Sequence, residues 1–463
     1  MKKIKLILMS FLVVLASSCT TEDLDPNLDQ NKLANGGITK VDNLYAVIKG
    51  AYNRMTGSGY YGRDLIIANE VRTDNCFSNG SSGRFTTEAG FTYSSTTGYF
   101  WDDAYRVIES ANLVINTDVS LLEGDQDYGR HLQGQAYAIR ALAHFDLLKQ
   151  YGQIHVTGGT TPGGIPYQTT YLSSDSSQEE LFPPRNTVEE VKTKIFEDLE
   201  TAFSLMQDTG DTNFFTKYAA KALETRVAVY FEMWDTAIDA AEEVIDNGGY
   251  EIVSESNYVS SFGSDGGSNV IFELEFSATD NLSSDALGYI YRSTGGGSYG
   301  DVQVIDEVAD IFEPTDVRGL FDGENGILGY EDDMLRNMGK FPDNRGYDNV
   351  PVMRYEELIL NYAEALLETG GDALTQLNKI PANRGASEYA TATKENILLE
   401  RRKELMFEGF RYDDLLRTGS DIEKYSVQQN ISATVPYGDF RLAWAIPLSE
   451  MDANSNMVQN KGY

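Results

Sequence analysis

Positive charge, histidine and cysteine are all scarce in this sequence. Its 463 residues carry 37 lysines and arginines against 71 aspartates and glutamates, a formal net charge of −34. Such a surface argues against nucleic acid as a partner, because binding to phosphates depends on clustered cations. Three histidines and two cysteines argue against a zinc centre, whose ligands are mainly nitrogen and sulfur. We expect no metal centre and no cofactor.

Long hydrophobic runs are missing as well. The apolar stretch at residues 6–15 has about ten residues, whereas a bilayer span needs roughly twenty. Lysines precede this stretch, and the small residues Ala16, Ser17 and Ser18 follow it, which is the pattern of an export signal. No later segment approaches a bilayer span, so the sequence predicts a signal over residues 1–18 and no transmembrane helix.

The residue after the small triplet is Cys19, and the preceding Leu-Ala-Ser-Ser resembles the lipobox of bacterial lipoproteins. This resemblance implies a lipid anchor on Cys19, with an ordinary secretory signal as the alternative. Three acyl chains would anchor the chain permanently, since each buried methylene contributes about 0.8 kcal/mol. Acidic residues in 20–25 resemble a sorting signal for the outer face of the outer membrane, or form a solvated linker. We expect residues 19–40 to be a lipidated linker and the unpaired Cys76 to be buried.

Apolar residues recur at helical spacing in several later segments. They predict helices within the ranges 44–55, 101–116, 132–151, 187–203, 355–369 and 372–380, and one long helix over 393–417. The clearest pair of helices is 216–247, where alanines at facing positions allow a close approach. This pair resembles a tetratricopeptide hairpin, although the strict repeat consensus does not recur.

Loop-rich segments separate these helices, and they include a strand-like run at 270–276. The loop-rich segments are 57–100, 153–186, 248–351 and 418–463. We therefore predict a mainly α fold, a scaffold of helical hairpins with long loops and a few short strands. Its N-terminal helical region would be 41–250, packed as one unit with a C-terminal region over 251–463.

Motifs of catalysis are absent or better explained by structure. Residues 295–300 are rich in glycine but lack the Gly-Lys-Ser/Thr of a phosphate loop. Glu400, Glu404 and Glu408 share one helix face, which fits either a pair of catalytic carboxylates or a structural ion network. The arginines between them favour the network, because arginine keeps carboxylates ionised. We expect no enzyme, and acidic runs such as 322–325 and 331–333 are more simply solvated than bound to Ca²⁺.

Motifs in a fixed order along the chain resemble the RagB/SusD family of surface lipoproteins. They include a tryptophan–tyrosine helix at 101–112, an arginine-led helix at 140–152 and a charged stretch at 400–417. The residues that match the family's structural motifs are Trp101, Tyr105, Arg140, Arg354, Glu364, Arg401, Glu404, Glu408 and Arg411. Pro381 stands where the family usually has arginine, which leaves the local turn open.

This SusD-like resemblance implies a catalytically inert protein with a tetratricopeptide-like scaffold at the cell surface. It also implies a partner, a SusC-like TonB-dependent β-barrel transporter, to which the protein delivers captured nutrient. The usual cargo in the family is an oligosaccharide, and some members take peptides. We expect a lipid-anchored protein of the outer membrane that faces the outside of the cell.

The resemblance implies a ligand pocket built by loops, and aromatic and polar residues gather in two of them. Tyrosine and phenylalanine rings complement the apolar faces of sugars, and aspartate, asparagine and arginine complement the hydroxyl rim. The candidate ligand-binding residues are Asp74, Asn75, Arg84, Phe85, Tyr93, Tyr99, Tyr289, Tyr291, Arg292 and Tyr299. For each tyrosine the alternative is a core residue with its hydroxyl at the surface.

Four functions stay open at this point. The leading hypothesis is a receptor that captures a glycan oligomer for a β-barrel importer. A peptide receptor on the same scaffold is the first rival, because the sequence has only three tryptophans for sugar stacking. A structural subunit of an outer-membrane assembly belongs to another class, and a surface glycosidase fits least well.

Overall fold

The computed structural model describes residues 37–292, 299–321, 326–343 and 345–463. The predicted signal, Cys19 and most of the predicted linker lie outside these ranges, as do residues 295–298 and 322–325. In the described part of the chain, no helix is both long enough and apolar enough to cross a membrane. Cys76 is buried, as predicted, and burial raises the pKa of its thiol.

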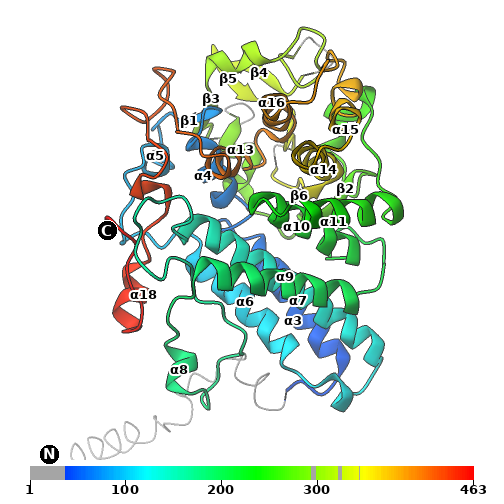
Figure 1. The fold of residues 1–463 in the computed structure, drawn as a ribbon, viewed down its shortest axis with the longest axis vertical. Coiled ribbons are helices and arrows are strands. Elements are labelled where there is room, and N and C mark those ends of the chain that lie inside the picture. Colours follow the sequence, from blue (N-terminus) through cyan, green and yellow to red (C-terminus); the bar gives the residue numbers. More distant parts are fainter. Residues whose placement is uncertain (1–36, 293–298, 322–325, 344) are drawn as a thin grey trace, which may run out of the picture.

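Long helices form a continuous stack. They are α3 (Val41–Met55), α6 (Trp101–Ile115), α7 (Gln126–Tyr151), α9 (Val188–Leu205), α10 (Lys217–Tyr230), α11 (Trp234–Asn247), α14 (Tyr355–Thr369) and α16 (Lys394–Leu405). Each helix packs on the next in this order, from α3 on α6 through to α14 on α16. Figure 1 shows α3, α6, α7 and α9 in the lower half of the molecule and α10, α11 and α14 above them. The predicted scaffold of helical hairpins is confirmed.

Local sequence sets the ends of these helices. At the start of α9, the Thr187 hydroxyl accepts the Glu190 N–H at 3.2 Å, and the Glu190 carboxylate accepts the Thr187 N–H at 2.7 Å. This reciprocal capping satisfies two amide groups that the helix itself leaves free. At the end of α14, Gly370 adopts a left-handed conformation with φ of 80°, which glycine tolerates without strain.

The longest helix that was not predicted is α4 (Asp64–Val71), which lies within the segment 57–100 predicted as loops. Residues 65–71 are all buried, so this helix has no exposed face and its sequence lacks the amphipathic period that signals a surface helix. The shorter helices are α5 (Thr86–Ala89), α8 (Gln178–Leu181), α12 (Tyr258–Ser261), α13 (Leu287–Tyr291), α15 (Ala373–Asn378), α17 (Arg411–Arg417) and α18 (Leu448–Ala453). Of these, α5, α8, α12, α13 and α18 also lie in segments predicted as loops.

The prediction of one long helix over 393–417 was wrong. The chain forms two helices there, α16 and α17, because Phe407 and Gly409 between them have φ of 73° and 82°, which a helix cannot continue through.

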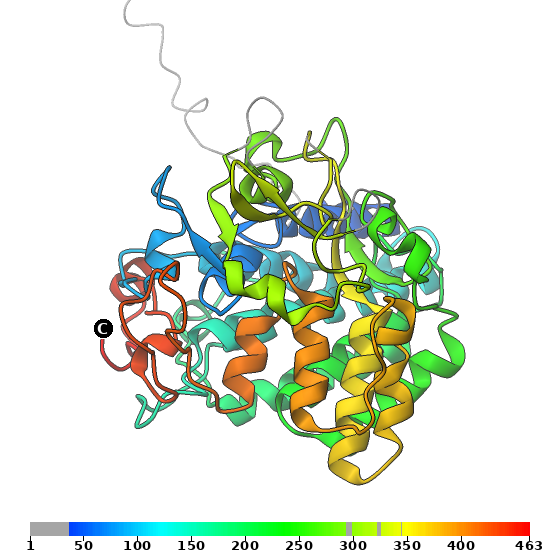
Figure 2. The same ribbon diagram turned by 90° about the horizontal axis from the view of Figure 1, so that it is seen from above.

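Strands are few and pair in three small antiparallel ladders within the described ranges. The pairs are β1 (Cys76–Ser78) with β3 (Val302–Val304), β2 (Val270–Leu274) with β6 (Val350–Arg354), and β4 (Leu328–Glu331) with β5 (Met334–Asn337). The strand-like run at 270–276 is thus a strand over its first five residues. Seen from above in Figure 2, the green β4–β5 hairpin and the yellow and orange helices α14 and α16 lie on opposite sides.

A buried ion network joins the C-terminal helices to the strands. The Glu404 carboxylate accepts hydrogen bonds from Arg384 at 2.9 and 3.0 Å, from Arg354 at 3.0 Å and from Arg318 at 3.3 Å. Burial opposes ionisation of Glu404, but Arg384 and Arg354 hold the pKa of this carboxyl well below its usual range. An ionised carboxylate cannot act as a general acid, so the geometry agrees with a structural network.

The other motif residues also make contacts within the scaffold. Two further glutamates of the network are bound in the same way: Glu408 pairs with Lys340 and Arg354, and Glu400 pairs with Arg318. The remaining ion pairs are Arg401 with Asp414, Arg417 with Glu364, Arg140 with Asp198 and Arg411 with Asp74. The rings of Trp101 and Tyr105 pack together with centroids 4.8 Å apart.

The departure at Pro381 does not disturb this network. Pro381 begins a single helical turn, and Gly385 follows it with φ of 66°. Arg384, between them, is fully buried and binds both Glu404 and Glu356. Proline is accommodated because the first residue of a turn needs no amide hydrogen.

Candidate functional site

Two loops distant in sequence meet beside the β1–β3 ladder. The ladder pairs Ser78 with Val302, and beyond it the Asn79 N–H donates to the Asp301 carbonyl at 2.9 Å. The Asn79 side chain also donates to the Gly300 carbonyl at 2.7 Å. This pairing brings the loop at 79–85 next to Tyr299, so that residues predicted from both loops form one surface, which we call the Arg84 face (Arg63, Arg84, Asp285, Tyr299 and Asp301).

Arg84 is the centre of the Arg84 face. Its guanidinium carbon lies 3.9 Å from the centroid of the Tyr299 ring, and one of its nitrogens lies 3.0 Å from the Asp285 carboxylate. Arg63 binds the same Asp285 oxygen at 2.5 Å. The Tyr299 side chain is 43% exposed. One side of the Tyr299 ring is therefore exposed to solvent, while the guanidinium on its other side is held in place by the Asp285 carboxylate.

Asp301 lies beneath this face with no hydrogen bond to either carboxylate oxygen, although it is only 1% exposed. The nearest cation is Arg84, with 3.8 Å between its Nε and one Asp301 oxygen. Arg336 is a second cation close enough to interact with Asp301, and its own Nε also has no hydrogen bond. The Arg336 Nε is ion-paired with the Glu331 carboxylate at 3.6 Å. Buried polar groups are normally bonded, so the two Asp301 oxygens indicate a place where a buried water completes the bonding beneath the face.

Two exposed aromatic residues at the β4–β5 hairpin were not among the predicted ligand residues. Arg336 on β5 donates to the Gly300 carbonyl at 3.0 Å, which fixes the β4–β5 hairpin beside Tyr299. Phe321, before the hairpin, is 56% exposed, and Tyr330, on β4, is 58% exposed. Their sequence signal is weak, because single aromatic residues in a loop have no period that separates core from surface.

Asp74 and Asn75, two predicted ligand residues, are occupied by protein groups. The Asp74 carboxylate binds Arg411 through two hydrogen bonds of 2.7 Å and also pairs with Arg402 at 3.0 Å. Burial opposes ionisation, but these arginines lower the pKa of Asp74 to about 2. Asn75 is fully buried between Glu70 and Arg402. Both side chains are bound by protein groups at the base of the loop, so neither belongs to the candidate ligand site.

Four of the predicted aromatic residues are wholly or partly buried. Phe85, Tyr93 and Tyr291 are less than a tenth exposed. Tyr93 donates to the Arg441 carbonyl, and Tyr291 packs between Phe341 and Phe407. Tyr99 stacks on Trp444 with ring centroids 4.1 Å apart. For these positions the structure favours the core alternative that the sequence left open.

Tyr289 and Arg292, the remaining predicted ligand residues, make contacts through or to backbone carbonyls. The Tyr289 carbonyl accepts the N–H groups of Tyr299 and Gly300, so this residue positions the exposed ring. Arg292 donates to the Phe341 carbonyl at 2.7 Å, and burial lowers the pKa of its guanidinium. Tyr289 therefore supports the Arg84 face, whereas Arg292 is held by the segment at Phe341. Among the residues that the structure describes, no group of three potential metal ligands is present.

Comparison with known proteins decides the family. Residues 24–229 match a family described as starch-binding and associating with the outer membrane, and residues 337–463 match the SusD family. The chain belongs to the SusD/RagB family. The resemblance stated from the sequence motifs is thereby confirmed.

Individual SusD/RagB relatives are distant in sequence, and the matches cover from about a quarter of this chain to all of it. The SusD-like protein P2 of Formosa agariphila is 24% identical over 532 residues, an alignment that covers all of both chains. The starch-binding protein SusD of Bacteroides thetaiotaomicron is 30% identical over 127 residues, 27% of this chain and 22% of that protein. A solved SusD superfamily protein from Bacteroides vulgatus is 27% identical, has a TM-score of 0.81, and covers 92% of this chain and 100% of its own.

Proposed function

We propose that this SusD/RagB protein is a cell-surface receptor that captures a nutrient oligosaccharide without cleaving it. The observation that carries the proposal is the Arg84 face, where an exposed tyrosine ring stacks on an arginine beside a partly exposed carboxylate. The match of residues 24–229 to a starch-binding family and the starch-binding role of the relative from Bacteroides thetaiotaomicron support a glycan as the ligand.

The chemistry of a sugar fits this arrangement. A pyranose ring has an apolar face of C–H groups that packs on the free side of Tyr299, and hydroxyl groups at its rim. Those hydroxyls can accept from Arg84 and donate to Asp285, whose side chain is 45% exposed beside it.

Anchoring and delivery are further parts of the proposal. Acylation of Cys19 would hold the receptor in the outer membrane, facing outward, and residues 20–40 would serve as its tether. A SusC-like TonB-dependent β-barrel would then import the captured chain. The description of the matched family as outer-membrane-associated supports this location.

Calorimetry with a panel of neutral oligosaccharides tests the glycan site. We expect one member to bind, and Tyr299→Ala and Arg84→Gln each to weaken its affinity about tenfold, since about 1.4 kcal/mol is lost with the stacked ring or the charged donor. Tyr437→Ala is the matched control, because Tyr437 is equally exposed, at 42%, outside the Arg84 face. This control should bind as the unmodified protein does.

Other outcomes would assign a different function. Binding of a peptide that depends on Tyr299, with no detectable binding of any glycan, would indicate a peptide receptor. No detectable binding of either glycans or peptides would indicate a structural subunit. Release of new reducing ends from a bound glycan would show an enzyme and refute the inert receptor.

A further inference from the structure

Almost every arginine of the described chain is held by another protein group. Side-chain hydrogen bonds or ion pairs engage all of them except Arg54 and Arg106. This exception is unexpected in a chain with 71 acidic residues, where carboxylates are available almost everywhere. An arginine that stays unpaired in such a chain is a free donor for something else.

Both free arginines line one groove on the helical scaffold. Arg54 lies at the end of α3 and lines a cavity of about 530 Å³, whose floor is the exposed side of α6. Arg106 lines this cavity and also a second one of about 400 Å³, which continues along α6 toward Pro183 and Glu450. Glu109 lines both cavities as well. Each volume is typical of pockets that hold small organic ligands, and neither shares a lining residue with the Arg84 face.

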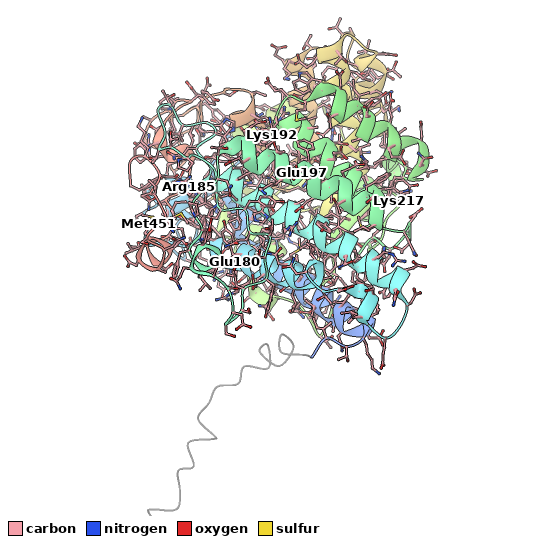
Figure 3. The ribbon with its side chains drawn as sticks, turned by 60° about the horizontal axis from the view of Figure 1, so that its bottom comes forward. Glu180, Arg185, Lys192, Glu197, Lys217 and Met451 are labelled. Carbon is pink, nitrogen blue, oxygen red and sulfur yellow. The ribbon has the colours of Figure 1, made fainter. Side chains whose placement is uncertain are left out.

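The far wall of this groove is built by the chain before and after α8 and by α18. Asn454, directly after α18, donates to the Pro183 carbonyl at 2.9 Å and so joins the two segments. Figure 3 brings this side forward and shows Glu180 of α8 and Met451 of α18 toward the same end of the molecule. Gly50 of α3 lines the opposite wall, where the absence of a side chain leaves space. We call this feature the α3–α6 groove.

Apolar and polar groups alternate along the α3–α6 groove. Val47, Leu113 and Tyr171 provide apolar surface next to Arg54. Between the two cavities, the Glu109 carboxylate accepts the Leu172 N–H at 2.6 Å, and burial raises its pKa to about 7 despite this bond. A half-protonated Glu109 can donate a hydrogen bond instead of repelling an anion. Asp103 is the carboxylate that both arginines sense: burial raises its pKa, and the charges of Arg106 and Arg54 oppose this rise, although neither arginine forms a salt bridge or hydrogen bond with it. Asp102 and Glu450 line the second cavity as well.

We propose that the α3–α6 groove is a second binding site, for a carboxylate- or sulfate-bearing stretch of an oligosaccharide. An anionic group there would bind the forked N–H donors of Arg54 and Arg106, a geometry that matches carboxylate and sulfate oxygens. The apolar wall would take the ring faces of the same sugars. The choice of a saccharide rests on the proposed function, whereas the choice of an anion rests on the two unpaired arginines.

The probes are acidic oligosaccharides paired with neutral forms of the same chain. A short oligogalacturonate is compared with its methyl ester, and a sulfated galactan oligosaccharide with its desulfated parent. By calorimetry we expect an acidic member to bind at least about tenfold more tightly than its neutral form, and the double variant Arg54→Gln/Arg106→Gln to abolish this preference. High salt should weaken the acidic member selectively.

Control variants separate this site from the Arg84 face and from simple charge effects. Arg130→Gln/Arg345→Gln removes the same number of charges from exposed positions and should leave the preference intact. Tyr299→Ala should leave it intact too, even where it abolishes binding of a neutral glycan. Arg54→Lys/Arg106→Lys, which keeps the charge, should retain part of the preference and shows that loss in the glutamine variant is not misfolding.

Several results would overturn the proposal. Equal affinity for acidic and neutral forms, or a preference that survives the double glutamine variant, would exclude a role for these arginines. A preference that depends on Tyr299 would place the anion at the Arg84 face. Arginine-dependent binding of inorganic phosphate or of phosphatidylglycerol vesicles, with every acidic oligosaccharide silent, would replace the saccharide with a free anion or a lipid headgroup.

Discussion

The buried ion network and the Arg84 face both join arginines to carboxylates, but they differ in how much water reaches them. In the network, the side chains of Arg384 and Glu404 are fully buried and all their edges touch protein. At the face, Arg84 and Asp285 are 27% and 45% exposed, and one side of the Tyr299 ring is open. The same chemistry therefore stabilises the fold in one region and leaves binding groups available in the other.

The substitution Glu404→Gln tests the buried side of this comparison and should have the largest effect. This change leaves Arg318, Arg354 and Arg384 without their shared negative charge in a site that water cannot reach. We expect the free energy of unfolding to fall by about 3–5 kcal/mol, measured by urea denaturation. A loss below about 1 kcal/mol would mean that the network contributes no more than surface pairs do.

The substitution Asp74→Asn tests an ion pair whose exposure lies between that of the buried network and that of the Arg84 face. The folded pKa of Asp74 is about 2, below its ordinary 3.8, so the stabilising effect is present above pH 3.8 and disappears as the pH falls through about 2. We expect a loss of about 2 kcal/mol near neutral pH, and equal stability of variant and unmodified protein in strong acid.

Glycan affinity provides the second measurement on Asp74→Asn. Because both Asp74 oxygens face Arg402 and Arg411, the folded variant should bind the glycan as the unmodified protein does. A variant that is stable but no longer binds would return Asp74 to the ligand site, as the sequence first suggested.

Arg84→Lys tests the exposed side of the comparison. Lysine keeps the charge beside Asp285 but cannot stack its flat face on Tyr299 or present two parallel donors. We expect a roughly threefold to tenfold weaker affinity for the glycan by calorimetry, with the unfolding midpoint unchanged. A large fall in stability would show that this face belongs to the core.

Arg345→Gln should have the smallest effect. Arg345 is 65% exposed and its pair with Asp343 lies on the surface. We expect the free energy of unfolding to change by less than about 0.5 kcal/mol. A larger change would remove the distinction between buried and exposed pairs on which the other predictions rest.

The helical scaffold could be predicted because it is periodic. Helices such as α6 and α11 bury one face, so their apolar residues recur at a spacing that is visible in the sequence. The charged spacing of Glu400, Glu404 and Glu408 likewise indicated a network. α4 could not be predicted in this way, because it is buried on all sides and has no period.

The candidate site was predicted only in part, because exposure in loops depends on contacts between distant residues. Tyr299 and Tyr291 look alike in sequence, yet one is exposed and the other is packed against Phe407. Asp74 has an ordinary loop sequence around it, and its partner Arg411 is more than three hundred residues away. The free state of Arg54 and Arg106 is invisible in sequence for the same reason, since a missing partner can be recognised only in three dimensions.

The stacking of Tyr99 on Trp444 gives the protein a built-in optical reporter. Trp444 is buried, and the centroids of its ring and the Tyr99 ring lie 4.1 Å apart. The guanidinium carbon of Arg72 lies 4.7 Å from the centroid of the Trp444 ring. Tyr99 follows the segment that carries Arg84, so a ligand that shifts this segment will change the surroundings of the indole and its fluorescence. With Trp101 and Trp234 replaced by phenylalanine, the emission of Trp444 alone would follow ligand capture without any attached dye.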